Sequence, residues 1–203
     1  MTDITPDTIL KFWFGDLVDG LASPNIRARW FASSNTFDQA CTQFSPVLQQ
    51  ARDGHLADWL QQPKTLLAYV ILCDQLPRNI YRGDRSAYAY DDLALAAAKQ
   101  AVTQHMDQQL GWDERAFLYM PFEHSEDLLD QHTAVGLFSA LRDRASGETR
   151  SLMGNSLRYA QQHRDIILRF GRFPHRNAVL GRTSTPEEAQ FIAEGDGFGQ
   201  NTG

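Results

Sequence analysis

The residues with the clearest chemical potential lie in the stretch 119–127, Tyr-Met-Pro-Phe-Glu-His-Ser-Glu-Asp. It places Glu123 directly beside His124. A carboxylate and an imidazole can tune each other's proton affinity, so the two side chains suit acid/base chemistry. We expect Pro121 to end a helix near Met120 and Ser125 to cap the next one. Glu123 and His124 would then lie between helices, and they form the predicted catalytic pair, with a structural role as the alternative.

A second stretch, Asp-Gln-Leu-Pro-Arg-Asn, covers residues 74–79. Asp74 continues the apolar stripe of a helix expected over residues 64–76, and Pro77 is expected to end that helix. An acid on an apolar stripe is not free in water. We predict that Asp74 and Arg78 bind a ligand, and the alternative is a buried salt bridge from Asp74 to Arg78 or Arg82.

A third stretch, Arg-Phe-Gly-Arg-Phe-Pro-His-Arg-Asn, covers residues 169–177. Gly171 is expected to end a helix over 149–170. Arg172, His175 and Arg176 follow it in non-helical backbone, and three potential cations within five residues make an anion site if they converge. We predict them as ligand-binding residues. The alternative is a structural network with nearby carboxylates.

Other kinds of site find little support. The candidate ligands Asp74, Glu123, His124 and His175 show no i, i+3 or i, i+4 spacing, so no metal site is predicted. The sequence has no glycine-rich phosphate loop, no nucleophile elbow and no cysteine–histidine couple with usable spacing. We therefore expect no cofactor.

Composition limits the partners and the compartment. The net charge of −6 argues against binding to nucleic acid or to an anionic membrane. Three Lys stand against sixteen Arg, which suits recognition of anions but equally fits the codon bias of a GC-rich genome. Cys41 and Cys73 fall in apolar helical patterns and indicate a reducing environment. With no signal peptide and no long apolar run, we expect a cytoplasmic protein.

The pattern of apolar residues predicts an all-α fold, with antiparallel helices joined by short turns. Thr5 and Pro6 begin the first helix, and Thr185 and Pro186 begin the last, which carries Phe191 and Ile192. Residues 16–34 are expected to hold Trp30 and Phe31 in the core. Other helices are expected over 36–52 with a kink at Pro46, over 86–105, in a short segment ending near 120, and over 126–144. We predict one domain over 1–194 and a flexible tail over 195–203, in which Phe198 could dock.

The three stretches described above, with Leu-Gly-Arg-Thr-Ser-Thr-Pro-Glu-Glu at 180–188, resemble the bacterial family known as domain of unknown function 924. The resemblance covers most of the chain. It implies a compact, right-handed, tetratricopeptide-like array of helix pairs, although no repeat of 34 residues is visible. It implies no activity.

Two functional hypotheses of different classes follow, beside a purely structural one. The first is a pocket that binds a small anionic molecule, with acid/base catalysis as its extension; Tyr119, Phe122 and Phe173 would form its walls. The second is a tetratricopeptide-like module that presents a concave groove to a peptide or protein. In the third, the charged cluster only ties helix ends together.

Overall fold

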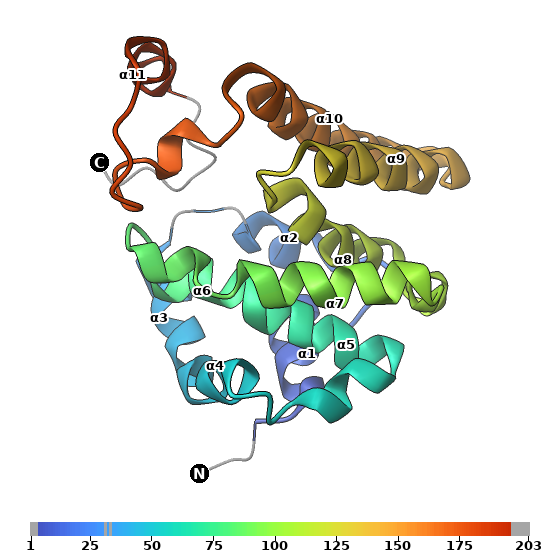
Figure 1. Cartoon of the computed structure of the whole chain (residues 1–203). Coiled ribbons are helices and arrows are strands. Elements are labelled where there is room, and N and C mark those ends of the chain that lie inside the picture. The colour runs from blue at the N-terminus through green and yellow to red at the C-terminus, as the bar shows by residue number, and fades with distance from the viewer. Residues whose placement is uncertain (1–3, 31, 33, 196–203) are drawn as a thin grey trace.

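A computed structural model describes residues 4–30, 32 and 34–195, and within these ranges the chain is helical without a β-strand (Figure 1). An isolated bridge joins Val18 and Leu21. The α-helices are α1 (Pro6–Phe14), α2 (Pro24–Trp30), α3 (Asn35–Cys41), α4 (Ser45–Arg52), α5 (Pro63–Val70), α6 (Leu76–Ile80), α7 (Asp91–Thr103), α8 (Trp112–His124), α9 (Leu128–Arg144), α10 (Gly147–Phe170) and α11 (Pro186–Ala193). Short 3-10 or π turns are η1 (Thr42–Phe44), η2 (Ala57–Gln61), η3 (Ile71–Gln75), η4 (Arg85–Tyr88), η5 (Met106–Gln109) and η6 (Pro174–Arg176). The predicted all-α fold is confirmed.

The main core is built around α5, which packs against α1, α7 and α8. From Leu66 to Cys73 all side chains are buried, because helices surround this segment on every side. Small residues of α7, such as Ala94 and Ala98, are fully buried and allow close helix approach. Aromatic rings from α1 and α2 complete the core, with Trp30 packed edge-on against Phe117 at 4.6 Å.

The expectation that Pro77 ends its helix is wrong. The chain widens into the π turn η3 and continues into α6, where Pro77 occupies the first turn and its missing N–H breaks no helical bond. Two carbonyl groups of the widened turn accept hydrogen bonds from side chains four residues later. Arg78 Nη1 donates to the Asp74 carbonyl at 2.6 Å, and Asn79 Nδ2 donates to the Gln75 carbonyl at 2.9 Å.

Pro121 does not end its helix either, because α8 runs through it to His124. Its last turn is held from outside, by Gln131 Nε2, which donates to the carbonyl oxygens of Glu123 at 2.6 Å and Ser125 at 2.7 Å. Glu123 and His124 are therefore helical, contrary to the prediction. The N-cap of α9 is Asp127 rather than Ser125, whose hydroxyl donates to Asp130 instead.

Two further boundaries differ from expectation. The helix expected over 36–52 is divided into α3, η1 and α4, so the break falls at Thr42–Phe44, ahead of Pro46. The helix expected over 86–105 consists of η4 and the shorter α7. The first and last helices begin at Pro6 and Pro186 as predicted, each with a capping threonine.

The segment after α10 forms a small unit of its own. Gly171, with φ 69°, ends α10 in the left-handed conformation, as predicted. Ile166, Ile167 and Phe173 form a separate apolar cluster there, against which Phe170 and Phe191 pack. In Figure 1 this segment, with η6 and α11, lies beside the end of α10 and above α6.

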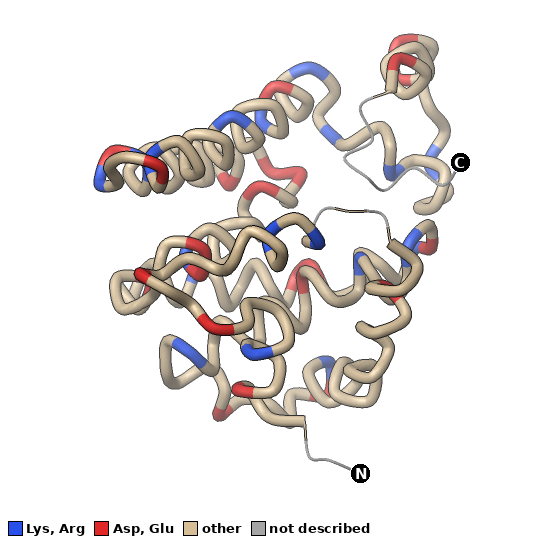
Figure 2. Tube along the Cα trace, turned by 180° about the vertical axis from the view of Figure 1, so that it is seen from behind, with Lys and Arg blue, Asp and Glu red and all other residues tan. Residues whose placement is uncertain are grey.

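Several predictions lie outside the described residues, namely the placement of Phe31 and of the tail beyond Gly195, including Phe198. The tetratricopeptide-like arrangement and the single domain remain predictions. Among the described helices, none is both long and apolar enough to cross a membrane. Basic and acidic residues are interspersed along the described trace rather than gathered by sign (Figure 2).

Candidate functional site

A cavity of about 530 Å³ lies where α6, α8, α10 and η6 meet. Its polar lining includes Gln75, Arg78, Asn79, Arg82, Glu123, His124, Asn155, Ser156, Tyr159, His163, His175 and Arg176. Its apolar lining includes Trp30, Ala116, Phe117, Met120, Phe138 and Leu152. Volume and mixed lining are typical of a small-molecule site.

Helical periodicity explains which residues reach the cavity. On α8 they are Asp113, Ala116, Phe117, Met120, Glu123 and His124, which follow steps of three and four and so share one face. On α10 the lining residues from Leu152 to His163 repeat the same steps. Two facing helical stripes thus form the long walls, while α6 and η6 close one end.

Asp74 and His124 form the tightest pair at that end, with Oδ1 and Nδ1 2.7 Å apart. Asp74 is fully buried in η3, behind the cavity wall. Burial alone would raise the pKa of Asp74, but the Arg78 charge and the His124 contact hold it below its usual range. Burial, followed by the Arg78 charge, lowers the pKa of His124. A neutral His124 that donates from Nδ1 to the Asp74 carboxylate has its lone pair on Nε2, the nitrogen suited to accept a proton.

Arg78 connects this pair to a second carboxylate. It donates through Nη1 and Nη2 to both oxygens of Asp91, at 2.8 and 2.9 Å, and lies 3.3 Å from Asp74. Burial disfavours its charge, yet Asp74 and Asp91 together raise the pKa of Arg78 above its ordinary value. This arginine is fully engaged in holding the site together.

Glu123, next to His124 in the sequence, pairs with a different histidine. Its Oε1 lies 3.0 Å from Nδ1 of His163 on α10. The Tyr159 carbonyl lies 2.9 Å from the same nitrogen, so two acceptors surround Nδ1 and it carries the hydrogen. The rings of His124 and His163 are 6.1 Å apart, which gives the cavity two carboxylate–histidine pairs side by side.

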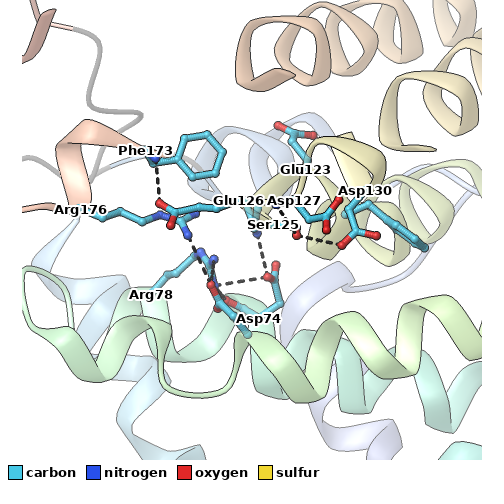
Figure 3. A network of polar contacts seen from close by, with 12 residues as sticks. Asp74, Arg78, Glu123, Ser125, Glu126, Asp127, Asp130, Phe173 and Arg176 are labelled. Atoms are coloured by element: carbon cyan, nitrogen blue, oxygen red, sulfur yellow. Dashed lines mark hydrogen bonds and ion pairs between the residues drawn. The ribbon is translucent and has the colours of Figure 1, made fainter. Parts of the chain in front are cut away.

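Arg176 and His175 enter from η6. Arg176 is 6% exposed, and its guanidinium packs over the rings of Tyr88 and Phe173 at 4.7 and 4.4 Å. Its nearest carboxylate contact is Asp91 at 3.7 Å, and burial, together with the Arg78 charge, lowers its pKa. Burial and then the Arg176, His163, Arg78 and His124 charges lower the pKa of His175 to about 3. Figure 3 shows Arg176 and Arg78 reaching toward the same place from different segments, while Glu123 points away from them.

The structure brings most of the predicted site residues together. Arg78, Glu123, His124, His175 and Arg176 line the cavity, and Asp74 supports two of them from behind. Arg172 is not among the lining residues, because it holds both oxygens of Glu188 at 2.6 and 2.8 Å and the Thr183 carbonyl at 3.0 Å.

The predicted walls differ from the observed ones. Tyr119 faces the core, where its hydroxyl donates to Asp107 at 2.6 Å, and Phe122 is buried. Phe173 stacks on Arg176 and does not line the cavity. Trp30, Phe117 and Phe138 supply the aromatic walls instead. Periodicity along α8 could have identified Phe117, whereas no pattern in the sequence indicates Asp91 or His163 as partners.

Glu126 anchors the η6 segment to the body. It accepts two hydrogen bonds from Arg182, at 2.7 and 3.0 Å. It also accepts one from the backbone N–H of Phe173 at 2.8 Å (Figure 3). Asp127 caps α9, whereas Glu126 makes this longer connection. Among the described residues, no group of three or more histidine, cysteine or acidic side chains is arranged to hold a metal ion.

Comparison with known proteins agrees with the motifs. The family described as "Bacterial protein of unknown function (DUF924)" matches residues 9–196, and the chain belongs to this family. A solved structure, "Structure of Protein of Unknown Function ATU0120 from Agrobacterium tumefaciens", is similar, with 37% identity and a TM-score of 0.79. That match covers 94% of this chain and 97% of the other. No curated protein matches the chain significantly.

Proposed function

We propose that the cavity binds a small molecule through one anionic group on that molecule. We further propose that the paired histidines transfer a proton to or from the bound molecule. In this proposal Arg176 holds the anion, with His175 beside it and Arg78 fixing the surrounding geometry. His124 and Glu123 belong to the proton-transfer groups, and Asp74 orients His124.

The observation that carries the proposal is that Arg176 lacks, within the described part of the chain, the paired hydrogen bonds to a carboxylate that other arginines of this protein make. Arg78, Arg82, Arg172 and Arg182 each donate two hydrogen bonds to a single carboxylate. Arg176 Nη1 instead lies 3.7 Å from Oδ2 of Asp91, and its buried Nε has no hydrogen-bond partner among the described residues. A buried guanidinium with an unfilled donor fork is costly, and a ligand carboxylate would fill it.

Proton transfer would use the orientation that the carboxylates impose. His124 would take a proton from the ligand at Nε2, and the Asp74 carboxylate would stabilise the imidazolium that forms. The Glu123–His163 pair, with its ring 6.1 Å from that of His124, would supply the second acid/base group.

A thermal-shift screen against small carboxylates and phosphates tests the binding site. A ligand at 100 times its dissociation constant adds about 2.7 kcal/mol, or roughly 5–10 °C for a chain of this size. The shift should vanish in Arg176→Met and persist in Arg169→Met, since Arg169 is an exposed arginine paired with Glu187. A hit that survives Arg176→Met, or a screen without any hit, would contradict the proposed site.

The proton-transfer step needs a separate measurement. A ligand identified in the screen is incubated with the protein in deuterated water, and incorporation of deuterium into the ligand is followed by NMR. We expect incorporation with the wild type and none with His124→Gln, which should still bind the ligand. Binding without incorporation in the wild type would leave a binding protein and remove the catalytic role.

A further inference from the structure

The apolar part of the cavity narrows the class of ligand further than the anion site alone does. Along α8 the lining changes from Glu123 and His124 to Ala116 and Phe117. Seven residues of helix correspond to about 10 Å, so the two kinds of lining are well separated along the cavity. We call Arg78, Arg176, His124 and His175 the anion end, and Trp30, Ala116, Phe117 and Leu152 the apolar end.

Contacts across the cavity support this separation of the anion end from the apolar end. His163 of α10 touches Glu123 at 3.0 Å, while Leu152 lies eleven residues, or about 16 Å, nearer the start of α10. Trp30 packs against Phe117 at 4.6 Å. Glu123 and His163 therefore meet at one end of the cavity, and Ala116, Phe117 and Leu152 lie toward the other, with the polar Asn155 and Ser156 next to Leu152.

Charge balance limits the anionic group. At the anion end the positive charges of Arg78 and Arg176 are equalled in number by the negative charges of Asp74 and Asp91, so little net positive charge is available, although Arg176 itself lies 3.7 Å from Asp91. Such a site suits one negative charge on a planar group that fits the fork of Arg176, whereas a doubly charged phosphate would face these carboxylates. Past the apolar end the cavity is also lined by Asp113 and Arg27, which lie 3.5 Å apart, and Asp113 accepts from the Ala22 N–H at 2.8 Å. Because Asp113 balances the Arg27 charge, this end offers no net positive charge to a reversed ligand.

Building on the proposed function, we propose that the ligand is an amphiphilic monocarboxylic acid. Its carboxylate binds at Arg176, and its hydrocarbon body extends along α8 past Met120 toward Phe117 and Trp30. The apolar end then supplies affinity through burial of hydrocarbon, and the anion end sets the orientation.

Titration calorimetry with butyrate, hexanoate and octanoate tests this ligand class, with inorganic phosphate alongside. Burial of one methylene corresponds to about a fourfold gain in affinity, so octanoate should bind at least a hundredfold tighter than butyrate. Equal affinities for butyrate and octanoate, or tighter binding of phosphate, with the Arg176 dependence retained, would overturn the amphiphilic class and leave the proposed anion site standing. No binding by any of these anions would overturn both.

A blocking variant locates the hydrocarbon body. Ala116→Phe fills the apolar end and should weaken octanoate binding at least tenfold while leaving butyrate unchanged. Ala140→Phe is the matched control, because Ala140 is exposed on α9 outside the cavity lining. If Ala116→Phe does not fold, Ser156→Phe on the facing wall of α10 makes the same test. Unchanged octanoate binding in a folded blocking variant would overturn the placement of the hydrocarbon body along α8.

Discussion

Asp74 and His124, fifty residues apart, lie 2.7 Å from each other and join the π turn η3 to the last turn of α8. Both proline-containing motifs are needed for this contact. Pro77 follows the widened turn that presents Asp74, and Pro121 lies within the helix that ends at His124. The pair combines a buried, ionised acid with a neutral imidazole at the edge of a cavity, which is the arrangement that acid/base chemistry requires.

Asp74→Asn should destabilise the protein strongly. The asparagine keeps the shape but removes the charge that balances Arg78 and orients His124, and breaking a buried ion pair costs about 3–5 kcal/mol. Asp91 still holds Arg78, so we expect about 3 kcal/mol, measured by urea denaturation. Asp92→Asn is the control, because the ion pair between Asp92 and Arg52 is exposed. A loss below about 1 kcal/mol would mean that the network is weaker than its geometry indicates.

His175 should make stability depend on pH. Its pKa falls from 6.5 to about 3 in the folded protein, so between these values the unfolded chain binds the extra proton. This contribution to stability is fully present above pH 6.5 and is lost as the pH falls toward 3, with a slope of up to about 1.4 kcal/mol per pH unit.

The measurement for His175 compares unfolding free energies across this pH range. His175→Gln should flatten the pH dependence, whereas His132→Gln, at an exposed position on α9, should leave it unchanged. Equal slopes in wild type and His175→Gln would show that His175 does not contribute in this window.

The motifs predicted which residues would meet, but not how they would pair. Five of the predicted residues converge at one place, namely Asp74, Glu123, His124, His175 and Arg176. The prediction rested on their position at helix ends beside proline and apolar residues, where we expected charged side chains to be buried. Adjacent helical residues point about 100° apart, so Glu123 reaches α10 while His124 reaches η3. Which neighbour each one meets depends on how the helices are rotated against each other, and local patterns do not specify that rotation.

The two proline predictions were wrong because a proline removes only one backbone donor and need not end a helix. Pro77 lies in the first turn of α6, and α8 continues through Pro121 to His124. Side chains also bind carbonyl groups nearby: Arg78 and Asn79 bind those of η3, and Gln131 binds those at the end of α8. Arg172 was expected at the site because it lies near His175 in the chain, but Glu188 in α11 holds it elsewhere.

Glu126→Gln should loosen the segment that carries Arg176. The change weakens the double hydrogen bond to Arg182 and the bond from the Phe173 N–H, so amide exchange over 171–182 should accelerate. Any ligand that depends on Arg176 should bind more weakly, while the melting temperature of the main core changes little. Glu187→Gln serves as control, since its partner Arg169 is exposed. Unchanged exchange in Glu126→Gln would contradict an anchoring role.

The central claim is that Arg176 is held for a ligand rather than for the fold. It is tested most directly by the unfolding free energies, without ligand, of Arg176→Met and Arg78→Met. Removing Arg78 leaves Asp74 and Asp91 without their close cation and should cost about 3–5 kcal/mol. Removing Arg176 relieves a buried, poorly paired charge, so that variant should lose less than about 1 kcal/mol or gain stability. A loss in Arg176→Met as large as that in Arg78→Met would contradict the claim and assign Arg176 to the structural network.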